Sequence, residues 1–75
     1  MTGMLWFDNN MKHNSITSIL NATAYYADKY GERPNTCHMN ADMLPGDTNE
    51  IDGVALKEDP EVIDNHLWIG VEPIE

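Results

Sequence analysis

The chain is short of basic residues, of cysteine and of long apolar runs, and each shortage excludes a class of function. Four Lys and Arg residues stand against 13 Asp and Glu, which gives a formal net charge of −9. A field of this sign repels phosphate, so we expect no direct binding to nucleic acid and none to an anionic membrane. The single cysteine, Cys37, excludes an internal disulfide and fits a reducing compartment.

Targeting signals and cofactor motifs are also missing. No stretch approaches the roughly 20 apolar residues that span a bilayer. The first residues, MTGMLWFD, lack the basic leader and long apolar run of a signal peptide. No CxxC, HxxxH, HExxH, GxGxxG or phosphate-loop spacing occurs. We therefore expect a cytoplasmic protein with no cofactor, no metal site and no membrane anchor.

The residues that are present suffice for one folded domain spanning positions 1–75. Hydrophobic residues make up 41% of the chain and charged residues 23%, which is a globular rather than a disordered composition. A chain of this length buries only about 60% of the surface that it exposes when unfolded, so its core must be small.

The apolar pattern predicts an α+β fold of order β-α-β-β-β, with one main helix on one face of a three- to four-stranded mixed sheet. The helix should start between residues 10 and 15 and end at Gly31, which is suited to a left-handed cap. Strands are expected at 4–7, 36–40, 51–57 and 66–72, and a helical turn at 41–44. Within the third strand, Asp52-Gly53 is either a bulge or a tight turn. The helix stripe comprises Ile16, Ile19, Leu20, Thr23, Ala27 and Tyr30, with Tyr26 beside it.

The order of the elements also predicts how the strands are arranged. The first two strands would lie side by side in parallel, joined by the helix as a right-handed crossover. The last two would form an antiparallel meander.

A single helix of about four turns can cover only one face of such a sheet. In the last strand, Leu67 and Ile69 suit the helix side, which leaves Trp68 on the other face. If Trp6 also points outward, the open face carries an aromatic patch of the kind that marks an interface, and a two-fold homodimer would cover it. The candidate interface residues are therefore Met4, Trp6, His66 and Trp68.

The alternative is that the chain covers its own tryptophans. Met43 and Leu44, or the C-terminal Pro73 and Ile74, would then fold back over them and complete the core internally.

Acidic side chains concentrate in the second half of the chain. Along one edge they would form a negative strip able to imitate nucleic acid in the site of a nucleic-acid-binding protein. Ordinary solvation of polar loops is the simpler explanation. The strip comprises Asp47, Glu50, Asp52, Glu58, Asp59, Glu61 and Asp64.

A third hypothesis is a metal- or thiol-dependent site in which Cys37 and His66 meet on adjoining strands. Neighbours on a strand point to opposite faces, so Cys37 and His38 would not chelate one metal together. A small buried hydrophobe is the simpler interpretation of Cys37.

Three segments resemble a group of short bacterial and prophage proteins: YYADKYGERP at 25–34, CHMN at 37–40 and HLWIGVE at 66–72. The resemblance spans most of the chain, but the group has no assigned activity, so it implies no function. From the residues themselves we expect a non-catalytic, acidic interaction or regulatory domain. Its partner would be another protein or a second copy of the chain, and an enzyme is less expected.

Overall fold

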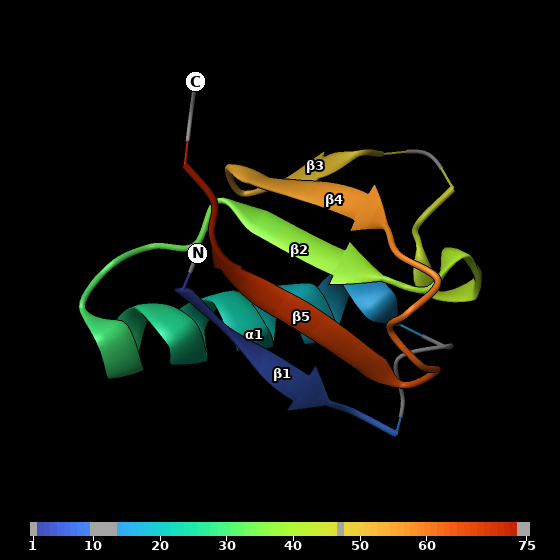
Figure 1. Cartoon of the computed structure of the whole chain (residues 1–75), viewed down its shortest axis with the longest axis horizontal. Coiled ribbons are helices and arrows are strands. Elements are labelled where there is room, and N and C mark those ends of the chain that lie inside the picture. Colours follow the sequence, from blue (N-terminus) through green and yellow to red (C-terminus); the bar gives the residue numbers. More distant parts are fainter. Residues whose placement is uncertain (1, 10–13, 47, 74–75) are drawn as a thin grey trace.

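The computed structural model describes residues 2–9, 14–46 and 48–73. The α+β prediction is confirmed, because the helix α1 (Ser15–Tyr30) packs on one face of a mixed sheet (Figure 1). The sheet has five strands, more than predicted. They are β1 (Thr2–Phe7), β2 (Thr36–Met39), β3 (Glu50–Ile51), β4 (Val54–Glu58) and β5 (His66–Val71), with the short 3-10 helix η1 (Ala41–Met43) after β2.

The additional strand arises from the Asp52-Gly53 pair. Both residues have positive φ, 52° and 83°, as the two central positions of a type I′ hairpin turn require. Glycine adopts this backbone without cost and aspartate tolerates it. The predicted third strand therefore folds as the tight hairpin β3-β4, in which Ile51 pairs with Val54.

The strand order is β1-β5-β2-β4-β3, which corrects the predicted topology. The first two strands, β1 and β2, are parallel but not adjacent, because β5 lies between them and is antiparallel to both. The predicted meander of the last two strands is also wrong, since β4 pairs in parallel with β2 instead. The physical reason is burial: β5 carries Leu67 and Ile69, both fully buried, and a strand flanked on both sides buries more than an edge strand.

Local signals define both ends of α1. The Asn14 side chain accepts a hydrogen bond from the Thr17 backbone N–H at 3.1 Å, which caps the start. Gly31 ends the helix with φ 69°, as expected, and its N–H donates to the carbonyl of Ala27.

The buried face of α1 differs from the predicted stripe. Ile16, Leu20 and Tyr30 are each 42% exposed. The helix is rotated about its axis relative to this expectation, and the face that meets the sheet includes the bulky Ile19 and Tyr26. The buried positions are Ser18, Ile19, Ala22, Thr23 and Tyr26.

The core lies between α1 and the sheet. Met43 of η1 is buried in it, and Leu44 packs against it, so this segment contributes to the core. Pro73 is exposed, and Ile74 lies outside the described residues. The remaining core side chains are Ile19, Ala22, Tyr26, Cys37, Met39, Val54, Leu56, Leu67 and Ile69. Within the described ranges, no helix is both long and apolar enough to cross a membrane.

Burial controls the chemistry of Cys37, which is fully enclosed and whose thiol pKa is raised to about 12. We predict that a disulfide reagent at pH about 8 labels the native chain at least ~100-fold more slowly than the urea-unfolded chain, because thiolate is the reacting form. Stopped-flow thiol titration checks this. Equal rates in the two states would show that the thiol is accessible.

Candidate interaction surface on the open face

The face of the sheet opposite α1 is here called the open face. In Figure 1, α1 runs behind the sheet and no described helix covers the front. Side chains alternate along a strand, and the register aligns Leu5, Trp68, His38 and Lys57 in one row across β1, β5, β2 and β4. These residues share the open face, since the neighbouring positions in β5 and β2 point into the core.

The structure separates the two tryptophans. Trp6 points to the helix side, where it packs against the core with its ring centroid 5.3 Å from that of Tyr25. Met4 lies on that side as well. Trp68 and His66 are on the open face. The four candidate interface residues therefore do not form one surface.

Exposed apolar residues that the sequence did not single out take their place. Leu5 is 63% exposed, Phe7 56% and Ile63 64%. All four residues at 4–7 are apolar, so their pattern could not tell which two face outward. The register resolves it, because Trp6 pairs with Leu67 on the core side. Ile63 follows Val62 in a short connection between two predicted strands and gave no signal beyond its own hydrophobicity.

Trp68 lies flat on the sheet because of Gly3. A Cβ atom added at Gly3 would stand 1.9 Å from Cζ2 of the Trp68 ring, so the indole occupies the space above this glycine. The ring also meets His38 edge-on, at 5.4 Å between centroids. Trp68 is therefore a half-buried platform rather than a protruding side chain.

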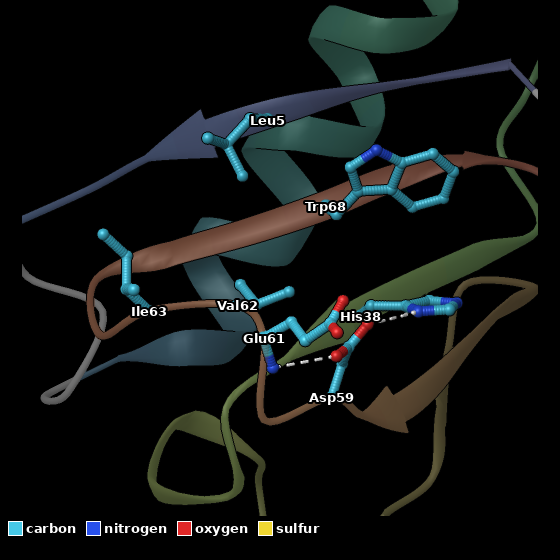
Figure 2. A pocket seen from close by; sticks show the side chains of 7 residues that line it. All are labelled: Leu5, His38, Asp59, Glu61, Val62, Ile63 and Trp68. Atoms are coloured by element: carbon cyan, nitrogen blue, oxygen red, sulfur yellow. Dashed lines mark hydrogen bonds and ion pairs between the residues drawn. The ribbon is translucent and has the colours of Figure 1, made fainter.

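A hollow of about 600 Å³ lies beside this platform. Figure 2 shows the side chains that line it: Leu5 from β1, Trp68 from β5, His38 from β2, and residues of the loop between β4 and β5. The end near Leu5 is apolar, and the end near His38 is polar. The lining residues are Leu5, His38, Asp59, Glu61, Val62, Ile63 and Trp68.

The polar end ties the loop to β2. The Nδ1 atom of His38 lies 3.2 Å from Oδ2 of Asp59, and Oδ1 of Asp59 accepts the backbone N–H of Glu61 at 3.0 Å (Figure 2). The Glu61 N–H and then the His38 hydrogen bond lower the pKa of Asp59. Since a carboxylate only accepts, Nδ1 carries the proton. The other ring nitrogen, Nε2, is buried and has no partner among the described residues. It is therefore not presented to a molecule in the hollow.

The structure does not bring Cys37 and His66 together. Cys37 is enclosed in the core, whereas the His66 ring packs against Phe7 on the opposite face, with the two tilted rings 5.0 Å apart between centroids. Across the described part of the chain, no group of three or more His, Cys, Asp or Glu side chains is placed to hold a metal ion.

The predicted acidic strip divides into two groups at opposite ends of β4. Glu50 and Asp52 lie at the hairpin end, where Nη2 of Arg33 contacts Oδ2 of Asp52 at 2.9 Å. Glu58 and Asp59 lie at the other end, and Asp59 is held by His38. Asp47 is outside the described residues. The loop after β4 carries Glu61 and Asp64.

The contact between Trp68 and Gly3 generates a stability prediction. Gly3→Ala forces the indole off the sheet, so we expect a loss of about 1–3 kcal/mol in the free energy of unfolding. Gly46→Ala is the matched control, because nothing lies within 4 Å of an added Cβ there; it should change stability by less than about 0.5 kcal/mol. Urea denaturation measures both. Equal effects would show that the close approach does not constrain the fold.

The lowered pKa of Asp59 generates a pH prediction. A depressed native pKa stabilises the fold above the unfolded pKa of about 3.9, and that contribution is lost as the pH falls through the native pKa. Asp59→Asn should therefore be less stable than the parent chain at neutral pH, and this difference should shrink below pH about 4. Urea unfolding across this range checks it, with the exposed Asp42→Asn as the control for removing one negative charge. A difference that stays constant with pH would contradict the assignment.

Comparisons with protein-family models, with curated proteins and with solved structures found no match to this chain. The function of the open face is therefore inferred from its own geometry.

Proposed function

We propose that this chain is a non-catalytic protein-interaction domain that associates with a second copy of itself through the β1 side of the open face. The observation that carries the proposal is a group of apolar side chains that are each more than half exposed on this face. Leu5 and Ile63 line the hollow beside the Trp68 platform, and Phe7 lies two residues from Leu5 on the same face of β1. Single exposed apolar residues are common on protein surfaces, but a contiguous group marks an interface.

The size of this patch indicates a moderate affinity. Burying one such half-exposed side chain contributes about 1–2 kcal/mol. Three from each copy therefore contribute roughly 6–12 kcal/mol, against an association cost of about 4–15 kcal/mol. The balance favours reversible association, in the micromolar to millimolar range, over a permanent dimer.

A catalytic role has less support. The buried Cys37 thiol and the His66 ring are on opposite faces of the sheet, and the second nitrogen of His38 is buried. Imitation of nucleic acid also has less support, because the described carboxylates stand in two groups and two of them are engaged by Arg33 and His38.

Sedimentation velocity up to about 1 mM tests self-association. We predict that the parent chain associates and that Leu5→Glu weakens this at least ~10-fold, because a carboxylate placed in an apolar contact must be desolvated. Leu20→Glu is the matched control, since Leu20 is an exposed leucine on α1, away from the open face.

Two results would contradict the proposal. One is a parent chain that stays monomeric at every concentration. The other is an equal effect of the two leucine variants. Salt gives a further check, because an apolar contact should not weaken with ionic strength, whereas a carboxylate-driven one should weaken steeply.

A further inference from the structure

The strand β1 is an edge strand of the sheet and has none of the features that usually block pairing with another strand. Within the described part of the chain, β5 flanks it on one side and no strand pairs with the other (Figure 1). Edge strands are normally blocked by charge, proline, a bulge or short length. The opposite edge, β3, has two residues and one of them is Glu50. By contrast, the six residues of β1, TGMLWF, include no charge and no proline.

The hydrogen-bond pattern shows which backbone groups of β1 point outward. The Asp8 N–H donates to the Asn65 carbonyl at 2.9 Å, one step beyond the Phe7–His66 pair. Hydrogen-bonded pairs alternate along an antiparallel ladder. Because the backbone of Asp8 is hydrogen-bonded toward β5, the backbones of Trp6 and Met4 are hydrogen-bonded to β5 as well. The N–H and C=O groups of Gly3, Leu5 and Phe7 therefore point away from β5.

An independent contact supports this assignment of the backbone groups that point toward β5 and away from it. The Asn35 N–H donates to the Gly70 carbonyl at 2.9 Å, so the backbone of Gly70 points toward β2. Its neighbours Ile69 and Val71 must then point toward β1, as the first assignment requires.

We propose that β1 pairs with β1 of a second copy, antiparallel across a two-fold axis at Leu5, so that the two five-stranded sheets join into one. This inference rests on the proposed self-association and specifies its geometry. Of the exposed apolar group, Leu5 and Phe7 lie at the joined edge, whereas Ile63, in the loop before β5, lies outside it. The apolar area buried is therefore smaller than that of all three residues, and backbone hydrogen bonds supply part of the contact. In this register Leu5 faces Leu5, and Gly3 faces Phe7 of the second copy. All three residues have outward backbone groups, so each of these pairs exchanges two hydrogen bonds.

Side chains fit the same register. Trp68 fills the space above Gly3, so Phe7 of the second copy would pack against the edge of that indole. On the helix side, Met4 would face Trp6 of the second copy at a non-hydrogen-bonded position, and both are partly buried apolar residues. The paired edges would therefore be apolar on both faces of the joined sheet.

Repulsion between carboxylates is weaker when two copies pair at this edge than when their two open faces stack on each other. Joined at β1, the β4 strands of the two copies stand seven strand spacings apart, roughly 34 Å. This is about four Debye lengths at physiological salt, so their carboxylates repel little. Stacked sheets would instead lie about 10 Å apart, with Asp59 and Glu61 of each copy at the interface. Asp8, just beyond β1, would face Thr2 of the second copy rather than another carboxylate.

Methylation of single backbone nitrogens tests the pairing directly. The full chain can be assembled by ligation of fragments 1–36 and 37–75, because Cys37 supplies the junction thiol. N-methylation of Leu5 removes an outward donor and leaves the side chain intact. We expect the dissociation constant of the dimer to rise at least ~10-fold. The urea midpoint should stay unchanged when it is measured at a protein concentration well below that constant, where the chain is monomeric. N-methylation of Met4 is the matched contrast, because it removes a β1–β5 hydrogen bond and should lower that midpoint.

An isotope-filtered NOE experiment on a mixture of labelled and unlabelled chains provides the second readout. The proposed register brings the Cα atoms of Met4 and Trp6 of the second copy to about 4.5 Å, so we expect an intermolecular Hα–Hα NOE between them. A dimer that lacks this NOE and is unaffected by N-methylation of Leu5 would overturn edge pairing and leave self-association standing. A chain that remains monomeric would overturn both proposals.

Discussion

The alternation of side chains along β5 is the constraint on which the rest of the structure depends. This strand lies between β1 and β2, so it sets which residues of both neighbours face the helix. Leu67 and Ile69 point into the core, and the pairing partners of these residues, Trp6 and Met4, therefore point there as well. The same alternation leaves Trp68 on the open face and Leu5 opposite it. The alternation of side chains along β5 thus determines both which residues of β1 join the core and which are exposed on the open face.

The open face combines rigid and polar parts. Trp68 is held flat by the absence of a side chain at Gly3, and the loop carrying Val62 and Ile63 is tied to β2 through the contact between Asp59 and His38. Neither device requires a ligand to be in place. The surface is therefore pre-organised, which reduces the conformational entropy lost on binding.

The sequence signals for where an element ends were reliable, whereas the signals for which helix face is buried and which strands pair were not. Gly31 marked the helix end, and Asp52-Gly53 indicated either a bulge or a tight turn, because both signals depend on the backbone of one or two residues. Strand order could not be read, since it depends on which distant strand buries most when it takes a central position. The separation of Trp6 from Trp68 was hidden for a related reason: residues 4–7 are all apolar, and only pairing with β5 selects their inward face.

The pairing of β1 with β5 also has a consequence for how the chain reaches its fold. About 60 residues separate the two strands, and closing a loop of that length costs roughly 3–4 kcal/mol of chain entropy before any contact forms. Until residues 66–71 become available, the apolar segment LWF in β1 has no partner on either side. Newly made chains therefore pass through a stage in which a short, uncharged, strand-forming segment is open to solvent, and aggregation competes with folding at that stage.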